Sequence, residues 1–430
     1  MIFQDALRSL RKDAGRAFFY WLTFVLTAMF IFLFLNIAMS EAVGVTFVNT
    51  ANTDIATNVA MILIVICVVE ILFANDFYVR SKARELAVRL VCGATYMQLA
   101  QYLLIQTFIL LAAAIPFGII ASLMLIPLIN TVLHHVILSS FTVAIVPKAV
   151  ILTAVILIGV IFWATYLNLA FAYRHSAAGM MNETSLKLQG SSMVNTGKPL
   201  SRIRQILAVV LTVVPLVLFY VNPDGIILSS LIGLIGISGI LTRILIPLLS
   251  DYIDRKKPDQ PMIMAGVGFM RTDIAILKWN ILLLLITSIF LASVLISASD
   301  PQEIMLVLLS YIVMNVMLSL AIMFRYSTEL QSRFRYYRSL EQIGFMHEDQ
   351  KSNIRLEVTG LYGIILAVML LYIGNIFLAL VLDHRMSAAN AGMLTVFYLI
   401  PLILCCLLTM HYYSRAVLLQ PVKEGQAGGR

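Results

Sequence analysis

Charged residues are scarce in this chain of 430 residues and make up only 12% of it, whereas hydrophobic residues make up 61%. The mean hydropathy of +0.94 is far above the values typical of water-soluble proteins. The apolar residues also come in blocks of roughly 20, the length that crosses a bilayer as a helix. These features exclude a soluble globular domain and predict an all-α polytopic membrane protein with about ten transmembrane helices.

Transmembrane spans are expected near residues 18–40, 56–75, 103–128, 148–172, 204–221, 225–247, 278–298, 303–324, 358–382 and 391–412. With the N-terminus in the cytoplasm, all Lys and Arg residues except Lys148 and Arg385 fall on the inner side or at the inner end of a span. The positive-inside rule therefore predicts a multi-pass protein with cytoplasmic N- and C-termini. The net charge of +8 is explained by attraction to anionic membrane lipid, without nucleic acid as a partner.

Sequence signals of catalysis within this chain are missing. The four cysteines do not form a disulfide framework, and the phosphate-binding pattern GxxxxGK[ST] is absent, since Gly197-Lys198-Pro199 lacks its first glycine and its hydroxyl residue. We therefore expect no enzyme, no cofactor and no metal in this chain. His134 and His135 lack Cys or carboxylate neighbours, and we interpret them as part of an ordinary outer loop rather than as a site for metal or haem, or for sensing pH.

The most informative stretch is the charged segment at residues 75–107, because a weaker copy of it returns at 325–359, each between two long apolar runs. Aligning Gly93 with Gly344 also places Gln106 on Glu357. Since an even number of spans separates the copies, both enter the membrane from the same side. The sequence therefore predicts two parallel four-helix repeats around a central pair of spans.

The first charged segment predicts two helices with a joint between them. Ala83, Leu86, Ala87, Leu90 and Val91 form an apolar stripe at helical spacing, and the charged residues Lys82, Glu85 and Arg89 lie away from it. Gly93 permits a backbone conformation that is costly for other residues. Thr95 and Gln98 match the capping box that begins a new helix. A short amphipathic helix on the cytoplasmic side is thus joined rigidly to a transmembrane one, and the joint can transmit force.

Interfacial helices are also expected before the first and seventh spans. Phe3, Leu7, Leu10 and Ala14 line one face of an N-terminal elbow, and residues 265–280 form a second elbow. The predicted division is 1–173 (first repeat, spans one to four), 174–203 (cytoplasmic linker), 204–250 (central spans five and six), 251–415 (second repeat, spans seven to ten) and 416–430 (cytoplasmic tail).

Two charges fall within the spans, Glu70 in span two and Arg243 near the inner end of span six. A charge inside a bilayer is a functional candidate because its desolvation costs about 2.5 to 3.5 kcal/mol on insertion scales. Both lie toward the cytoplasmic side, so structural pairing or anchoring is the simpler interpretation. So few buried charges disfavour a secondary carrier that works without ATP.

The elbow, the second span ending in RSKARE, and the LVCGAT motif before the third span resemble the FtsX/MacB-type permease domain of ABC transporters. Two such domains around a central pair of spans resemble the ten-span bacitracin-exporter (BceB-type) permeases of Gram-positive bacteria. Those permeases carry a large extracellular domain between spans seven and eight, whereas only residues 298–303 join these spans here. The acid that the family usually has at the start of span three is Gln106 in the first copy and Glu357 in the second.

The resemblance implies the permease subunit of an ABC transporter in a bacterial plasma membrane. ATP and Mg²⁺ would be bound by a partner, an ABC ATPase that forms a dimer on each permease chain. Residues 80–98 and 333–350 would contact it, and the coupling residues predicted there are Lys82, Arg84, Glu85, Arg89, Gly93, Thr95, Arg335, Arg338, Glu341, Gly344 and Glu348.

The expected cargo is an amphipathic substrate such as a peptide antibiotic, a hydrophobic peptide or a lipid, which is exported or extracted from the membrane and gives antimicrobial peptide resistance. The alternative is an ATP-driven mechanotransmitter that regulates a sensor kinase or a cell-wall hydrolase.

Overall fold

The structure is a computed structural model whose described residues are 2–12, 14–39, 53–137, 144–174, 199–221, 226–256, 261–297, 301–333, 337, 341–342, 344 and 347–425. Within these ranges the chain is helical apart from short turns, and no described residue lies in a strand. Ten of the described helices are long and apolar enough to cross a membrane. The predicted all-α architecture with about ten spans is therefore confirmed.

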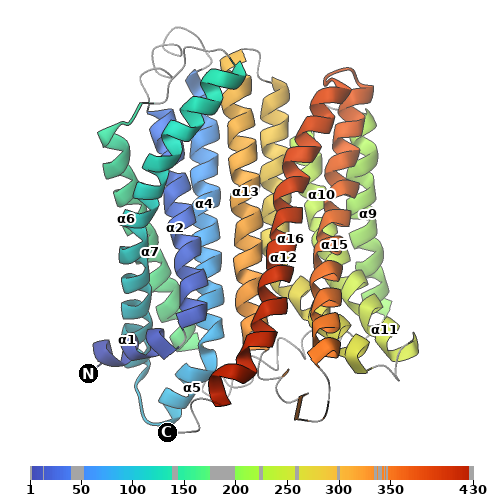
Figure 1. Ribbon diagram of the computed structural model, residues 1–430. Coiled ribbons are helices and arrows are strands. Elements are labelled where there is room, and N and C mark those ends of the chain that lie inside the picture. The colour runs from blue at the N-terminus through green and yellow to red at the C-terminus, as the bar shows by residue number, and fades with distance from the viewer. Residues whose placement is uncertain are drawn as a thin grey trace. The chain divides into compact units, whose positions relative to one another are not determined.

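The chain forms the following helices, of which Figure 1 labels the α-helices. They are α1 (Ile2–Lys12), α2 (Ala14–Ala38), α4 (Thr53–Ser81), α5 (Ala83–Val91), α6 (Tyr96–Ile137), α7 (Pro147–Arg174), α9 (Pro199–Val221), α10 (Ile226–Ile240), the π-helical η2 (Leu241–Leu245), α11 (Ile246–Lys256), α12 (Pro261–Ser297), α13 (Pro301–Ser332), α15 (His347–Leu382) and α16 (Ala388–Gly425).

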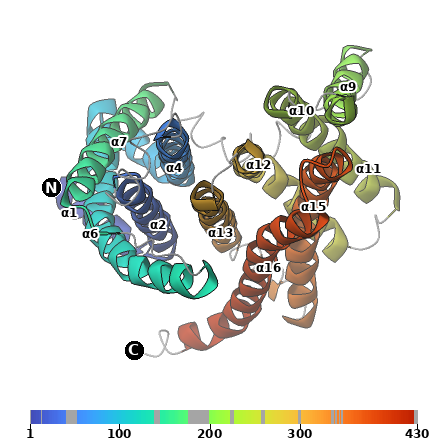
Figure 2. The ribbon, with the colours of Figure 1, turned by 90° about the horizontal axis from the view of Figure 1, so that it is seen from above.

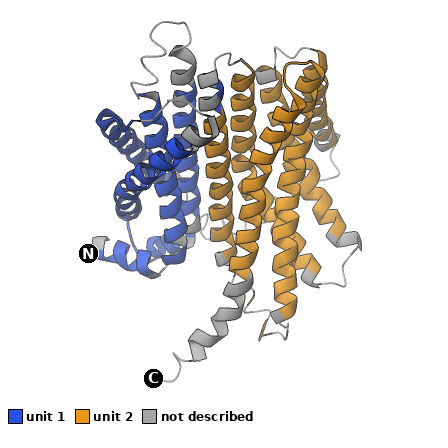
Figure 3. Ribbon diagram, turned by 45° about the horizontal axis from the view of Figure 1, so that its top comes forward, with its two compact units in different colours: residues 1–185, 300–307 blue, residues 186–299, 308–430 orange. Residues whose placement is uncertain are grey.

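The chain divides into two compact units, shown in Figure 3. Unit 1 comprises Met1–Ser185 with Asp300–Val307, and unit 2 comprises Leu186–Ser299 with Leu308–Arg430. The central spans, predicted over 204–250 as a separate element, thus belong to the same compact unit as most of the second repeat. The finer division into repeats stays a prediction.

In unit 1, α2 is the central helix and packs against α4, α6 and α7 (Figure 2). A chain of side-chain hydrogen bonds joins these four helices. The Tyr20 hydroxyl donates to Asn75 Oδ1 at 2.9 Å, Asn75 Nδ2 donates to Asn168 Oδ1 at 2.8 Å, and Asn168 Nδ2 donates to Thr107 Oγ1 at 3.1 Å. Polar groups buried between transmembrane helices are stable only when they are paired. This network therefore fixes how the four helices of unit 1 pack.

Helix α6 is the longest of the described helices, with 42 residues, and contains Pro116 and Pro127. Proline removes a backbone donor and bends a helix, and α6 curves around α2 in Figure 2. Gly118 lies at the contact, because a Cβ there would come within 2.8 Å of the Ala28 side chain on α2. His134 and His135 belong to this helix rather than to a loop, which corrects the sequence interpretation, and their side chains lie outside the described ones.

In unit 2, α9 and α10 form a hairpin held by close helix contact. A Cβ on Gly236 would come within 2.4 Å of Thr212 Oγ1, and one on Gly239 within 2.6 Å of Ala208 Cβ, so the absence of side chains lets the two backbones approach. The hairpin is anchored on α15, because the Tyr372 hydroxyl donates to the Ser230 carbonyl at 3.0 Å. The central spans are thus attached to the rest of unit 2 through α15.

The N-terminal elbow is present as α1, which lies across the ends of the helices of unit 1 (Figure 1) and contacts α6 and α2. Its buried side is formed by Ala6, Ser9 and Leu10, whereas Leu7, predicted for that side, is 39% exposed. The second elbow is not a separate helix, because α12 runs without a break from Pro261 to Ser297. The two repeats therefore begin differently.

The predicted linker and tail are partly helical. Residues 175–198 of the linker lie outside the described residues, but α9 already begins at Pro199. Likewise α16 continues to Gly425, well into the segment predicted as a tail.

Candidate coupling sites

The first candidate site is the joint between α4, α5 and α6. Helix α5 ends in a Schellman motif, in which the Gly93 amide donates to the Leu90 carbonyl at 3.1 Å and the Ala94 amide donates to the Arg89 carbonyl at 3.0 Å. Gly93 adopts a φ of +95°, a conformation that costs other residues energy. The chain can therefore reverse within a few residues and begin α6 at once.

The start of α6 is closed by a capping box, as the sequence predicts. The Thr95 amide donates to Gln98 Oε1 at 3.0 Å, and the Gln98 amide donates to Thr95 Oγ1 at 3.3 Å. Both ends of the turn are thus fixed by local hydrogen bonds. The connection from α5 to α6 is therefore short and ordered.

Helix α5 is amphipathic and anchored on its apolar side. Ala83, Leu86 and Ala87 are buried in a cluster with Leu99 and Leu103 of α6, and this cluster also includes residues of α1, α4 and α7. Val91, predicted as part of the apolar stripe, is not in this cluster and is 70% exposed, and the nearby Val88 is 51% exposed. The free face of α5 is therefore partly apolar.

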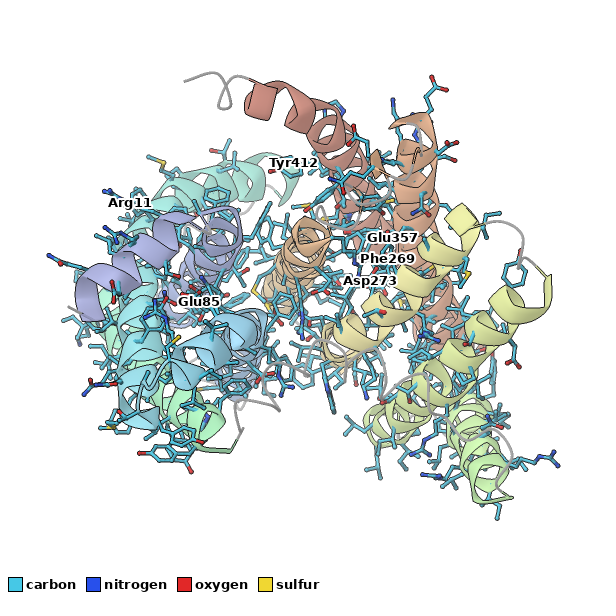
Figure 4. The ribbon with its side chains drawn as sticks, turned by 90° about the horizontal axis from the view of Figure 1, so that it is seen from below. Arg11, Glu85, Phe269, Asp273, Glu357 and Tyr412 are labelled. Carbon is cyan, nitrogen blue, oxygen red and sulfur yellow. The ribbon has the colours of Figure 1, made fainter. Side chains whose placement is uncertain are left out.

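Glu85 is the centre of a charged cluster beneath α1 (Figure 4). Ser9 Oγ donates to Glu85 at 3.0 Å, the Tyr102 hydroxyl donates to it at 2.6 Å, and Lys82 Nζ lies 3.3 Å from its carboxylate. Arg89 forms a fourth contact at 3.4 Å and stacks over the Tyr102 ring, with its guanidinium carbon 4.0 Å from the ring centroid. Glu85 thus connects α1, α5 and α6.

The electrostatics of this cluster favour a charged Glu85. Burial acts to raise the pKa of its carboxyl, but the hydrogen bond from Tyr102 and the positive charge of Lys82 outweigh it, so that the pKa lies below its ordinary value. Lys82 itself is only 1% exposed and donates to Ser9 Oγ at 3.1 Å. The sequence predicted only that Lys82 lies away from the apolar stripe, whereas the structure makes it an internal counter-ion. The side chain of Arg84 lies outside the described ones.

The second candidate site is the connection from α13 to α15. Gly344 adopts a φ of +105°, the counterpart of Gly93, and its amide donates to the Glu341 carbonyl at 2.9 Å. Glu341 and Glu348 are both exposed, and Glu348 lies in the first turn of α15, where the helix dipole favours an acid. Arg335 and Arg338 lie outside the described residues.

Next to this connection, unit 2 buries a cluster of three charged side chains that sequence reasoning did not assemble. Arg333, directly after α13, forms ion pairs with Asp273 of α12 and with Glu357 of α15. Asp273 is 1% exposed and Glu357 is fully buried. Figure 4 shows Asp273, Glu357 and Phe269 gathered at this point, and the guanidinium carbon of Arg333 lies 4.6 Å from the Phe269 ring centroid.

Two tyrosines complete the hydrogen bonding of Glu357. The Tyr326 hydroxyl donates to Oε1 at 3.1 Å and the Tyr337 hydroxyl donates to Oε2 at 3.3 Å. Burial acts to lower the pKa of Arg333, but the charges of Asp273 and Glu357 outweigh it, so that the pKa is raised further. Arg333 therefore stays charged and holds the end of α13 to α12 and α15.

The two sites correspond residue by residue in part. With Gly93 aligned to Gly344, Lys82 aligns with Arg333, and both are buried cations directly after the second helix of their repeat. This alignment was the one sequence signal that could have identified Arg333. Gln106, aligned with Glu357, is also fully buried, but it accepts a hydrogen bond from the Tyr78 hydroxyl at 3.3 Å and carries no charge.

The two charges predicted within the spans lie in different environments. Glu70 of α4 is buried, at 2% exposure, whereas Arg243 is exposed and lies in the π-helical turn η2. Neither of them lies at a joint. Among the described residues no cluster of His, Cys, Asp or Glu could hold a metal ion.

The comparisons with known proteins bear on the first joint. Residues 58–176 match the family model described as FtsX-like permease C-terminal, a stretch that includes most of α4 and all of α5, α6 and the described α7. No curated protein matches the chain. This stretch is therefore similar to an FtsX-like permease domain, and the match supports the membrane subunit of an ABC system, in which ATP is hydrolysed by a different subunit.

Proposed function

We propose that the protein is the permease subunit of a bacterial ABC transporter and that a separate ATPase dimer drives it through the two joints. The observation that carries this proposal is the first joint, where an amphipathic helix ends in a Schellman motif and leads directly into a capped helix of 42 residues. The family match over residues 58–176 supports it, because it covers this joint.

The free face of α5 is the surface that we assign to the ATPase. Glu85 and Lys82 are occupied by contacts with α1 and α6, so they hold the helix in place rather than face a partner. Val88 and Val91 are exposed on the same helix. Because apolar residues surrounded by polar ones are typical of docking surfaces, we place the contact there.

The proposed cargo is an amphipathic molecule such as a peptide antibiotic, a hydrophobic peptide or a lipid. Long apolar stretches of the described helices are exposed, for example Phe162 at 79% and Leu371 at 74%, so a cargo that is itself dissolved in the membrane can reach them laterally. Export or extraction of such a molecule would give resistance to antimicrobial peptides.

The alternative of an ATP-driven regulator of a sensor kinase or a cell-wall hydrolase rests on the same joint. The unbroken connection from α5 into α6 can move a partner at the far end of α6 as well as a cargo. Transport of a labelled peptide into or out of proteoliposomes separates the two, because only a transporter changes the amount of cargo in the lumen.

The decisive experiment for the permease assignment is co-purification from the native membrane. We expect one permease chain with two ATPase chains, measured by native mass spectrometry. A chain that carries no ATPase after mild extraction, together with ATP hydrolysis in the membrane that is independent of this protein, would refute the assignment.

A further inference from the structure

The π-helical turn η2 interrupts the helix of the sixth span at a basic residue. Such turns are rare and occur often at functional sites, because they widen the helix locally. The Nε2 amide of Gln205 on α9 donates to the Arg243 carbonyl at 2.9 Å and so gives one carbonyl of the turn a hydrogen-bond partner. The Arg243 guanidinium, in contrast, is exposed and reaches only the Arg204 carbonyl, at 3.5 Å.

Two further cations of unit 2 lie on one face of α12, where Arg271 and Lys278 are seven residues apart, or two helical turns. The turn η2, which carries Arg243, contacts α12, and the charge of Arg243 acts on the half-buried Lys278. Arg271 donates to Ser250 Oγ of α11 at 3.0 Å, and its Nε is buried without a hydrogen-bond partner. In the part of the chain whose side chains are described, none of these three cations forms an ion pair with a carboxylate.

The depth of these cations follows from helix length. Each residue of a helix advances 1.5 Å, so about 20 residues cross the hydrocarbon core. Counting from the loop end of α10 at Ile226 reaches the neighbourhood of Arg243, and counting back from the end of α12 at Ser297 reaches Lys278. Both cations therefore lie at a membrane boundary, on the side where the basic residues of the chain gather.

We propose that Arg243 and Lys278 bind the phosphate of an anionic phospholipid in this leaflet. A phosphate between them removes the repulsion of two like charges from different helices. Trp279, which is 54% exposed and has its ring centroid 4.9 Å from Lys278 Nζ, is suited to the headgroup region. Ile203 and Ile206 of α9, at 61% and 63% exposure, offer apolar surface for an acyl chain. A free phosphate would gain nothing from these apolar residues.

This lipid is a resident ligand and does not depend on the proposed transport function, so the two can fail separately. The full chain is purified in detergent and placed in nanodiscs of phosphatidylcholine alone or with phosphatidylglycerol. Bound phosphatidylglycerol is counted by native mass spectrometry, and the midpoint of thermal unfolding is measured in both lipids. The variants are Arg243→Gln and Lys278→Gln, and Lys148→Gln is the matched control, because Lys148 is an exposed cation in unit 1.

We expect phosphatidylglycerol to bind and stabilise the wild type, and each of the two variants to bind it about tenfold more weakly. In phosphatidylcholine the same variants should unfold at the wild-type temperature or above it, because one of two repelling cations is gone. This second measurement separates loss of binding from misfolding. Lys148→Gln and the charge-preserving Arg243→Lys should bind as the wild type does.

Three results would overturn the proposal. The first is that the wild type and both variants bind phosphatidylglycerol equally. The second is that inorganic phosphate stabilises the detergent-purified protein as strongly as the lipid does. The third is that Lys148→Gln loses as much binding as Lys278→Gln.

Discussion

The two joints place a buried cation at the same position, but they neutralise it in different ways. Lys82 is balanced by Glu85, which lies on α5 itself and is 32% exposed, and is further held by Ser9 of α1. Arg333 is balanced by Asp273 and Glu357, which lie on two other helices of unit 2 and are almost completely buried. The first joint therefore has its counter-charge on the short helix α5, whereas the second has it on the long helices α12 and α15.

This difference explains why the third helix of the first repeat has a neutral residue, Gln106, where that of the second repeat has an acid, Glu357. Gln106 can be neutral because Lys82 already has an acid beside it, and an added carboxylate there would be a buried charge in excess. Glu357, in contrast, is one of the two acids that pair with Arg333. We infer that the first joint is free to follow the ATPase, while the second fixes its connection to α12 and α15.

The largest effect is expected from removing the cation of the second joint. Arg333→Met leaves Asp273 and Glu357 as two buried acids without a cation, which costs about 3 to 5 kcal/mol in such clusters. Unfolding of the purified protein by titration with sodium dodecyl sulfate measures the loss. The triple variant Arg333→Met, Asp273→Asn, Glu357→Gln should recover most of it. If Arg333→Met alone unfolds like the wild type, the buried ion pairs are not what holds this joint.

Lys82→Met should cost distinctly less than Arg333→Met in the same titration. In this variant Glu85 keeps its hydrogen bonds from Ser9 and Tyr102 and is partly open to solvent. Its carboxylate therefore stays solvated and hydrogen-bonded without Lys82. Equal costs for the two variants would remove the contrast between an adjustable and a fixed joint.

A smaller and equal effect is expected at the two glycines. Both Gly93 and Gly344 have positive φ, and a Cβ at either would have no atom within 4 Å, so that only backbone strain opposes alanine. Each Gly→Ala variant should lose about 1 to 2 kcal/mol. Gly159→Ala is the matched control, because that glycine also has open space but no positive φ, and it should be neutral or slightly stabilising. Unequal losses at Gly93 and Gly344 would mean that the two turns are not equivalent.

The smallest expected effect is the dependence on pH of the stability that Glu85 contributes at the first joint. Because the pKa of Glu85 is lower in the folded protein than in the unfolded chain, its contribution is complete above the unfolded pKa. It is lost as the pH falls through the folded pKa. The variant Glu85→Gln should therefore flatten the acid side of a stability curve measured by thermal unfolding from pH 3 to 7. A curve parallel to that of the wild type would show that the carboxylate is not stabilised by its partners.

The features that the sequence predicted and those that it missed differ in how far apart the interacting residues lie along the chain. The capping box of Thr95 and Gln98 and the turn at Gly93 were predicted correctly because they depend on residues a few positions apart. The buried state of Lys82 and the pairing of Arg333 with Asp273 were missed because their partners lie 73 and 60 residues away. Asp273 was assigned to an amphipathic elbow, in which an acid is unremarkable, although α12 carries it into the core.

The central claim, that the ATPase drives the permease through the free face of α5, is tested most directly by permease-dependent ATP hydrolysis in proteoliposomes. The variants are Val88→Asp and Val91→Asp, both of which change exposed residues of α5. Ile145→Asp, an exposed apolar residue outside the joint at 54% exposure, is the control. We predict a loss of stimulated hydrolysis for the two valine variants and wild-type rates for the control. Wild-type stimulation by both valine variants would contradict the assignment of this face to the ATPase.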